Sequence, residues 1–290
     1  QVLIICPTYE LVHQTYEVIY NFINYMDDIT IMKVIGGSNL RECQLDLQKR
    51  PKIIIGTPGR ILDMINRKYL ITENISRLVF DEADEILSYG FKETIHNIVK
   101  FIPKTSQISL FSATLPDEVL EISELFMDNP EKILLQKDNI TLEGIKQYYV
   151  NVTDDKFKID TLMDIYGKLN VGQCIVYINS KYKLDQAYAQ LKQMDFPVEL
   201  INGELKMHER KHIINEFKSG NIRMLLSTDL LSRGLDIQQL SLVINLELPM
   251  NKESYIHRIG RSGRYGRKGV AINILNQREF NEMHSLVEYY

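Results

Sequence analysis

Short apolar runs rich in isoleucine and valine alternate along the chain with longer stretches in which apolar residues recur at helical spacing. In the first half the predicted strands and helices are Val2–Cys6, Leu11–Tyr25, Ile53–Ile55, Arg77–Phe80, Phe91–Phe101 and Ile108–Phe111. Continuous apolar runs are typical of strands buried on both faces, and strand–helix alternation is typical of a parallel sheet. The pattern therefore predicts an α/β domain whose parallel sheet is flanked by helices.

The alternation lapses in a polar stretch, QKDNITLEG, and then restarts. The apolar runs of the second half are Gln147–Val152, Cys174–Ile178, Val198–Ile201, Met224–Leu226, Leu242–Leu246 and Ala271–Leu275. A chain of 290 residues has room for two domains. We expect two tandem α/β domains, at residues 1–136 and 147–290, joined by a linker at 137–146. Because the chain begins inside an apolar run, we expect the first domain to be incomplete at its N-terminus.

Composition narrows the class of protein without naming a function. Lys plus Arg number 34 and Asp plus Glu number 38, so the net charge of −4 gives no sign of a nucleic-acid partner, and any such site must be local. The three cysteines are far apart and form no metal-binding spacing, which favours a reducing, cytoplasmic setting. No apolar run reaches the length that would span a membrane.

Unusual polar clusters follow directly after the predicted strands. They are PTYE, GTPGR, DEAD and SAT in the first half, and NSK and STD in the second. In open parallel sheets, ligands bind at the carboxyl ends of the strands. Each half therefore presents a functional edge.

The segment RLVFDEADEIL ends an apolar strand with two adjacent carboxylates, Asp81 and Glu82. Neighbouring residues at a strand end point to opposite sides, so one acid could hold magnesium while the other orients or deprotonates water. An acidic helix start is the simpler alternative. Nucleotide hydrolysis also needs a phosphate-binding loop, usually G-x-x-x-x-G-K-[ST], and these 290 residues contain none.

The segment YIHRIGRSGRYGRKG places arginines at every third position among glycines. Guanidinium groups suit phosphate oxygens, and the glycines favour a loop or a short helix over a plain basic helix face. The turns at Thr57–Arg60 and Gly36–Gly37 have small residues and backbone N–H groups that fit either an ordinary turn or a phosphate contact.

Taken in order, PTYEL, GG, TPGR, DEAD, SAT, IVYINS, STD with RGLD, and HRIGRSGR resemble the motifs of the DEAD-box family of ATP-dependent RNA helicases. The resemblance covers essentially the whole chain. Within the family, TPGRILDMINRKYL, ITLEGIKQYYVNV and TDLLSRGLDIQQLSLVINLELP are similar to the translation initiation factor 4A type. The resemblance implies two RecA-like domains that use ATP and Mg²⁺ to clamp RNA and unwind short duplexes.

The resemblance also implies roles for individual residues on the nucleotide side. Asp81 would lie in the magnesium shell, Glu82 would activate water, and Arg261 and Arg264 would contact the γ-phosphate. Residues facing the cofactor would be Asp81, Asp84, Gly234, Asp236, Arg261 and Arg264. Coupling to domain closure would run through Ser112 and Thr114, which Asp84 would bind, and through His257 and Arg258, which would tie their segment to the first domain.

RNA would run across both domains. The protein would contact mostly the backbone phosphates of the RNA, so its sequence preference would be weak. The RNA-binding residues implied are Pro7, Thr8, Gly37, Thr57, Pro58, Gly59, Arg60, Lys181, Gly203, Arg210 and Thr228. Tyr9, Lys181 and Met207 depart from the family pattern of Arg, Arg and Gln, which puts some RNA affinity in doubt. Further expectations are a monomer, and a HEAT-repeat translation-initiation scaffold as partner.

Three functions remain open at this point. The first is an ATP-dependent RNA helicase whose 290 residues alone, lacking a phosphate loop, are inactive. The second is a non-catalytic RNA- or scaffold-binding protein that resembles a helicase. A DNA helicase is a distant third, because DEAD with HRIGRSGR is a signature of RNA helicases.

Overall fold

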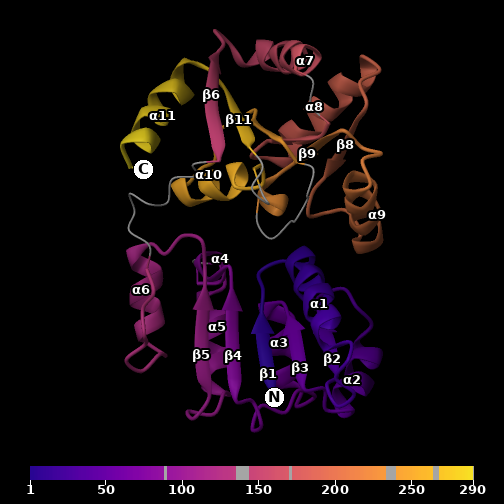
Figure 1. The fold of residues 1–290 in the computed structure, drawn as a ribbon, viewed down its shortest axis with the longest axis vertical. Helices are drawn as coiled ribbons and strands as arrows, with labels where there is room; N and C mark the ends of the chain where they lie inside the picture. The colour runs from indigo at the N-terminus through magenta and orange to yellow at the C-terminus, as the bar shows by residue number, and fades with distance from the viewer. Residues whose placement is uncertain (88–89, 135–143, 170–171, 233–239, 264–267, 290) are drawn as a thin grey trace. The chain divides into compact units, whose positions relative to one another are not determined.

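A computed structural model describes residues 1–87, 90–134, 144–169, 172–232, 240–263 and 268–289 (Figure 1). The chain divides into two compact units, Gln1–Lys132 and Ile133–Tyr290. Each unit is an α/β domain with one parallel sheet, as the alternation of apolar runs predicts. Residues 137–143, most of the expected linker, lie outside the described residues. Among the described residues, no helix is long and apolar enough to cross a membrane.

The first unit contains a five-stranded sheet in the order β2-β3-β1-β4-β5. Its strands are β1 (Val2–Ile5), β2 (Ile31–Val34), β3 (Ile53–Gly56), β4 (Arg77–Asp81) and β5 (Gln107–Phe111). Its helices are α1 (Tyr9–Ile23), α2 (Leu40–Gln48), α3 (Pro58–Asn66), α4 (Ala83–Ile86), α5 (Lys92–Lys100) and α6 (Asp117–Glu124). The sequence analysis missed β2, because Lys33 interrupts the apolar run of this four-residue edge strand.

The second unit contains a six-stranded sheet in the order β6-β11-β10-β7-β9-β8. Its strands are β6 (Ile145–Asn151), β7 (Cys174–Tyr177), β8 (Val198–Ile201), β9 (Met224–Ser227), β10 (Leu242–Asn245) and β11 (Gly269–Leu275). Its helices are η2 (Asp155–Phe157), α7 (Lys158–Lys168), α8 (Lys181–Gln193), α9 (Met207–Lys218), η3 (Asp229–Leu231), α10 (Lys252–Ile259) and α11 (Gln277–Tyr289). Strand β6 includes two residues that were expected in the linker, because Ile145 already pairs with Gly269 of β11.

Apolar packing differs between the two sheets. Every residue of β7, β9 and β10 is buried, and separate apolar clusters cover them. No residue of β5, at the edge of the first sheet, is fully buried, and Phe111 is 59% exposed. The second sheet therefore has a dry centre, whereas the β5 edge of the first sheet meets solvent.

Local sequence fixes how the chain leaves each strand. The Thr8 side chain accepts a hydrogen bond from the Leu11 N–H and so caps α1 directly after β1. Gly56 ends β3, where a Cβ atom would lie 2.5 Å from the Val34 carbonyl oxygen of β2. Only glycine allows that close approach of the two backbones.

Candidate functional site

The strand order sorts the candidate residues of the first unit into two halves of one edge. Because all five strands are parallel, their carboxyl ends meet at the same edge of the sheet. The turns carrying Gly37, Thr57 and Thr8 follow the neighbouring strands β2, β3 and β1. The acids follow β4, and Ser112 follows β5. Candidate RNA contacts thus occupy one half of the edge, and candidate nucleotide contacts occupy the other.

The two acids sit at the sharp turn from β4 to α4. Asp81 is the last residue of β4, and its Oδ1 accepts a hydrogen bond of 3.1 Å from the Glu82 N–H. Glu82 has a left-handed backbone with φ of 52°, an uncommon conformation for a residue with a side chain. Such strain is frequent at functional sites.

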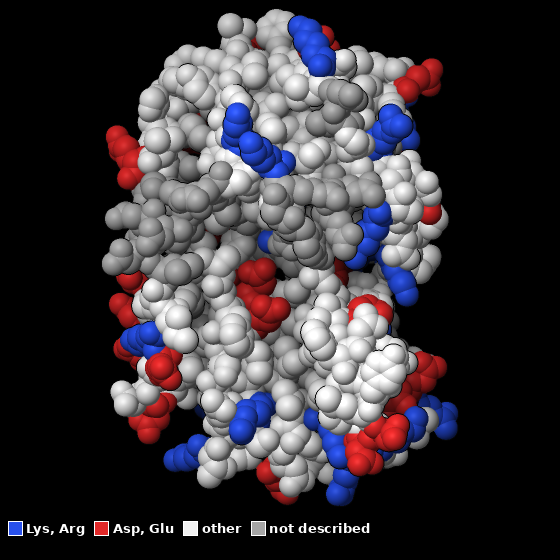
Figure 2. All heavy atoms as spheres, viewed as in Figure 1, with Lys and Arg blue, Asp and Glu red and all other residues white. Residues whose placement is uncertain are grey.

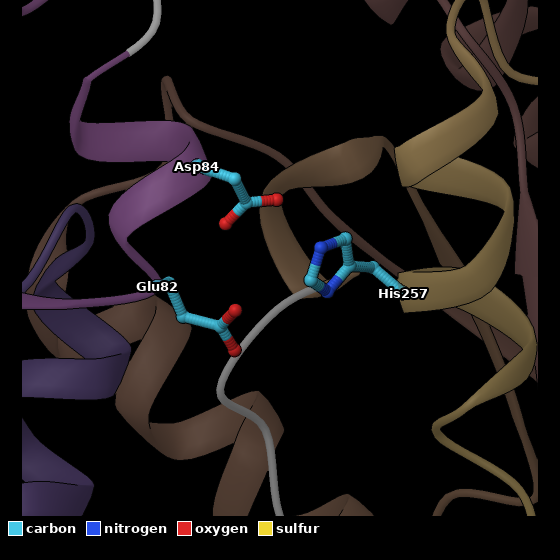
Figure 3. A group of neighbouring side chains, drawn as sticks. All are labelled: Glu82, Asp84 and His257. Atoms are coloured by element: carbon cyan, nitrogen blue, oxygen red, sulfur yellow. The ribbon is translucent and has the colours of Figure 1, made fainter. Parts of the chain in front are cut away.

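Asp84 makes the hydrogen bonds that the sequence analysis expected. It is buried in the first turn of α4, and its carboxylate accepts bonds from Ser112 Oγ at 2.8 Å and Thr114 Oγ1 at 2.7 Å. Figure 3 shows Asp84 and Glu82 projecting from the start of this helix. The contact joins the DEAD and SAT segments, and so it fixes the segment after β5 to the segment after β4.

The acid pair fits a magnesium ion. Burial raises the pKa of Asp81, and the neighbouring charge of Glu82 raises it further. Two adjacent carboxylates repel each other, which favours a divalent cation between or beside them, and carboxylate oxygens are ligands that Mg²⁺ prefers. Asp81 is the residue of this pair that we expect to hold it.

The candidate RNA contacts of the first unit are mostly backbone groups and small side chains. Gly37 has φ of 78°, so its turn needs glycine. Thr57 precedes α3 without capping it by a side-chain hydrogen bond, and Pro58 and Gly59 begin the helix. The Arg60 guanidinium donates to the Ser38 carbonyl at 3.3 Å, which joins the turns after β2 and β3. The arrangement leaves helix starts and turns at the edge, which suits phosphate contacts.

The site of the second unit is built around Arg258, which is completely buried on α10. Its guanidinium donates two bonds to the Asp229 carboxylate, at 2.6 and 3.0 Å. The remaining bonds reach the Asn179 and Asn245 side-chain oxygens, at 2.6 and 3.3 Å, and the Glu247 carbonyl, at 2.8 Å. One side chain thereby holds α10 against the ends of β7, β9 and β10.

These contacts give Arg258 a structural part within its own unit. The resemblance implies that Arg258 ties its segment to the first domain, and that role stays a prediction; within the second unit, each of its guanidinium nitrogens donates a hydrogen bond. The physical reason is burial: a guanidinium removed from water needs all its donors satisfied nearby. Arg258 is therefore a positioning residue for α10.

The neighbouring candidates of α10 are also buried. His257, which projects from α10 in Figure 3, is 1% exposed. Arg261 follows the C-cap Gly260, is 6% exposed, and donates from Nε to the His257 carbonyl at 3.1 Å. Arg264, Gly234 and Asp236 lie outside the described residues.

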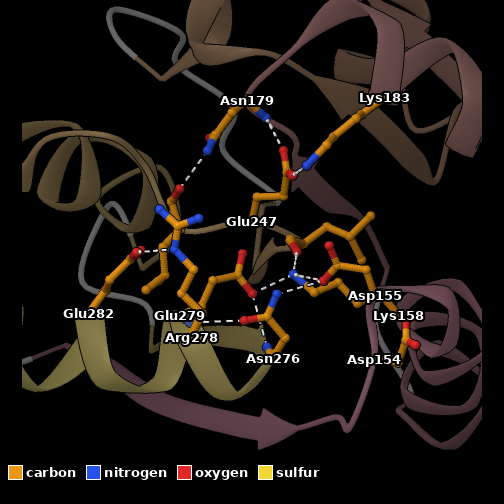
Figure 4. A network of polar contacts seen from close by, with 12 residues as sticks. Asp154, Asp155, Lys158, Asn179, Lys183, Glu247, Asn276, Arg278, Glu279 and Glu282 are labelled. Carbon is orange, nitrogen blue, oxygen red and sulfur yellow. Dashed lines mark hydrogen bonds and ion pairs between the residues drawn. The ribbon is translucent and has the colours of Figure 1, made fainter.

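A polar network that the sequence analysis did not identify supports this region (Figure 4). Glu247 accepts from the Asn179 N–H at 2.9 Å and from the Lys183 ammonium. Lys158, 4% exposed, donates to the Leu246 carbonyl at 2.8 Å and to Glu279 at 2.5 Å. The NSK and STD clusters contain Asn179 and Asp229, and so the sequence did carry part of this signal. A single lysine on an amphipathic helix carries no such signal.

The RNA candidates of the second unit follow three adjacent strands, β7, β9 and β8. Lys181 begins α8 and pairs with Glu204 at 3.0 Å and Asp185 at 3.2 Å, which ties it to the turn that carries Gly203. Thr228 precedes η3 and does not cap it with its side chain. Arg210 lies in α9. As in the first unit, these residues occupy one half of the sheet edge, whereas α10 follows β10 in the other half.

The charged residues on one face of the molecule form no further candidate site among the described residues. Figure 2 shows lysines, arginines and acids interspersed over the visible face, with no large block of one sign among the described residues. This distribution agrees with the small net charge of −4.

Two parallel-sheet domains, with an acid pair after a central strand of one and an arginine-bearing helix after a strand of the other, define the class of RecA-like helicases. The sequence assigns the family. The signature described as "DEAD/DEAH box helicase" matches residues 1–122, and that described as "Helicase conserved C-terminal domain" matches residues 157–266. The chain belongs to the DEAD-box helicase family.

Three relatives illustrate the match. The chain is 47% identical to "ATP-dependent RNA helicase eIF4A" of Kluyveromyces lactis, over 100% of this chain and 73% of that protein. It is also 47% identical to "ATP-dependent RNA helicase FAL1" of Candida glabrata, with the same coverage. Among solved structures, S. cerevisiae Dbp5 bound to RNA and ADP BeF3 has a TM-score of 0.94 at 33% identity, over 100% of this chain and 75% of that one.

Proposed function

We propose that this protein is an RNA-dependent ATPase that clamps RNA and separates short duplexes when it binds and hydrolyses ATP with Mg²⁺. The observation that carries the proposal is the turn after β4. There, Asp81 and Glu82 stand beside Asp84, and Asp84 is bound to Ser112 and Thr114. Acids aligned in this way are of no evident use in a protein that only binds RNA.

Each group would have a defined part in hydrolysis. Bound at Asp81, magnesium would neutralise developing negative charge on the phosphates. Glu82 would accept the proton of the attacking water. Arg261 and Arg264 would stabilise the γ-phosphate, and Gly234 and Asp236 would contact the nucleotide. Arg258 would keep α10 in place while they act, and the Asp84 contacts would transmit the state of the nucleotide to the segment after β5.

RNA would bind along the half-edges that carry Pro7, Thr8, Gly37 and Thr57–Arg60 in the first unit. In the second unit it would meet Lys181, Gly203, Arg210 and Thr228. Contacts of this kind read the phosphate backbone, so sequence preference should be weak and affinity should fall as salt rises. Because ATP and RNA would both favour the same closed state, each should strengthen binding of the other.

The decisive measurement is RNA-stimulated ATP hydrolysis by the chain joined behind the phosphate-loop segment of a family member. We expect turnover that Glu82→Gln reduces by about 100-fold or more, since a general base contributes about that much. The matched control is Glu85→Gln, one turn further along α4. Turnover that survives Glu82→Gln would contradict the assigned base.

The 290 residues alone should bind ATP very weakly, because they contain no G-x-x-x-x-G-K-[ST] loop. Isothermal calorimetry with Mg²⁺–ATP should show no saturable binding at micromolar nucleotide. If the chain binds RNA but never hydrolyses ATP in the joined form, the second candidate function, a non-catalytic RNA- or scaffold-binding protein, would replace the first.

We place the protein in cytoplasmic translation initiation, as a monomer that a HEAT-repeat scaffold would engage. Its similarity to eIF4A proteins supports this role. Because the chain is equally identical to a FAL1 protein, identity alone does not assign the initiation role, and an experiment must do so. The joined protein should restore translation in a cell extract depleted of its own eIF4A. Failure to restore it, with ATPase activity intact, would remove the initiation role alone.

A further inference from the structure

Helix α1 carries a stripe of aromatic rings that none of the roles above explains. Tyr9, His13, Tyr16 and Tyr20 recur at the spacing that places residues on one helical face. The rings of Tyr9 and His13 meet edge to face with centroids 5.4 Å apart, and those of Tyr16 and Tyr20 are stacked at 5.9 Å with planes 11° apart. We name these four residues the aromatic ladder.

A lysine from the neighbouring strand completes the ladder. The Lys33 ammonium of β2 lies 4.1 Å from the centre of the Tyr16 ring and 3.4 Å from His13 Nε2. One acid is also near, because Glu17 approaches His13 Nδ1 at 3.7 Å. A cation between aromatic rings is a combination that binds the phosphates and the base faces of single-stranded nucleic acid.

Core packing does not account for the ladder. The hydrophobic core described for the first unit includes none of its three tyrosines. Tyr20 is 47% exposed, and Tyr9, His13 and Tyr16 are half-buried. The side of α1 that is buried carries Glu10, Leu11 and Val12 instead. The rings are therefore arranged along a face that solvent reaches.

The position of the ladder points to its ligand. It begins at Tyr9, next to Thr8, and Lys33 lies shortly before Gly37 on the same strand–turn segment. Thr8 and Gly37 both belong to the half-edge where RNA is proposed to bind. From Tyr9 to Tyr20 the helix rises about 16 Å, roughly the length of five stacked nucleotides.

We propose that the aromatic ladder is a stacking platform for bases of single-stranded RNA that leave the half-edge at Thr8 and run along α1. The inference rests on the proposed function, because it assumes that RNA reaches that half-edge. It assigns the RNA contact of this region to ring faces with Lys33 as the phosphate partner. Since every base has a π-face, the platform would be tolerant of sequence.

The test measures binding of fluorescein-labelled oligo(U) of 6 and 20 nucleotides to the 290-residue chain over a range of salt concentrations. The double variant Tyr16→Leu/Tyr20→Leu should weaken binding of the 20-mer by about tenfold or more while changing the 6-mer little. The slope of affinity against salt should stay the same. Lys33→Met should instead reduce that slope by about one ion.

Matched variants separate stacking from other causes. Tyr20→Phe keeps the ring and should bind RNA as the unchanged chain does. Tyr25→Leu removes a tyrosine that is 92% exposed but outside the ladder spacing, and it should have no effect. Circular dichroism on all variants should show the same folded signal. A 2-aminopurine base in the 20-mer should lose its quenching only in the double variant.

The outcomes distinguish the ladder from the proposed function. If the unchanged chain binds both oligonucleotides and the double variant matches it, the ladder proposal is overturned and the function stands. If Tyr25→Leu weakens binding as much as the double variant, the surface is a general apolar patch of the kind that a partner protein would cover, and the proposal is again overturned. If neither oligonucleotide binds at any salt concentration, the RNA function itself fails, and the ladder proposal fails with it.

Discussion

The two units carry groups of opposite charge at the carboxyl edges of their sheets, and they hold these groups in different ways. In the first unit Asp81 and Glu82 form an acid pair, and burial, together with the neighbouring charge of Glu82, raises the pKa of Asp81. In the second unit Arg258 is wholly buried, and its guanidinium donates to four other residues. One site places two like charges side by side, whereas the other satisfies its charged group with hydrogen bonds inside the same unit.

This contrast separates groups that act on a ligand from groups that build the site. A carboxylate that will bind a cation gains from being under-neutralised beforehand, because the cation then relieves the repulsion. A buried arginine gains nothing from missing partners, since an unsatisfied buried donor costs stability. Arg258 thus belongs to the framework of the second unit, although it lies within the same HRIGRSGR segment as the candidate catalytic arginines.

The largest effect on stability is expected when the hydrogen bonds of Arg258 are removed. Arg258→Met should lower the free energy of unfolding of the second unit by about 3 kcal/mol, because acceptors on three strand ends lose their donor. The loss is moderated by Asp229, whose side chain is 43% exposed and can be hydrated. Hydrogen exchange measured by mass spectrometry resolves the two units and should show faster exchange in β7, β9 and β10 only.

The control for that comparison is Arg278→Met. Arg278 also pairs with an acid, Glu282, but its side chain is 88% exposed, so exchange in the second unit should hardly change. Equal effects of the two substitutions would refute the view that Arg258 is the anchor of the site.

A smaller effect is expected for the framework contact of the first unit. Asp84→Ala should destabilise that unit by about 2 kcal/mol, because the hydroxyls of Ser112 and Thr114 lose a charged acceptor. Exchange should accelerate at β4 and β5, which the contact joins. Asp63→Ala, which removes an exposed partner of Arg67, provides the comparison and should leave those strands unchanged.

The strained acid should respond in the opposite direction. Glu82→Gly should stabilise the first unit by up to about 1 kcal/mol, because glycine adopts φ of 52° without steric cost, while ATP hydrolysis by the joined protein is lost. Lys68→Gly, at φ of 60°, should give a similar gain and keep the activity. Destabilisation by Glu82→Gly with a normal Lys68→Gly would mean that the Glu82 side chain supports the fold.

The smallest effect is a pH dependence of the acid pair. Since the pKa of Asp81 is raised in the folded state from 3.8, the folded chain binds more protons than the unfolded chain just above that value, and stability falls as the pH rises through this window. Asp81→Asn should therefore raise the melting temperature at pH 7, by less than the gain at Glu82. The gain should shrink as the pH falls toward 3.8, and millimolar Mg²⁺ should reduce it at pH 7. A gain independent of pH would contradict the electrostatic cause.

Sequence patterns were sufficient for the strands that are buried on both faces and for the residues that follow them. The contacts of Asp84 with Ser112 and Thr114 were expected from the family resemblance and are confirmed. The edge strand β2 was missed because Lys33 interrupts its short apolar run. Strand order was also beyond the sequence, since pairing depends on contacts between distant segments. The division of each edge into two halves was therefore visible only in the fold.

The role of Arg258 shows a second limit. In sequence it is one of four arginines at equal spacing, and nothing local distinguishes it from Arg261. What separates them is their set of partners, because Arg258 donates to side chains that lie at the ends of three different strands. Motif spacing identified the right segment, but only tertiary packing could divide its members between framework and chemistry.

The division of each sheet edge has a consequence for engineering and for evolutionary change. In the first unit the turns after β2, β3 and β1 can vary while the strands that hold Asp81 and Asp84 remain untouched, provided that Gly56 is kept for its close backbone contact. Selection for a new RNA preference could therefore explore a library confined to those turns and to the face of α1. The rate of hydrolysis and the grip on RNA would behave as two separately adjustable parts of one scaffold.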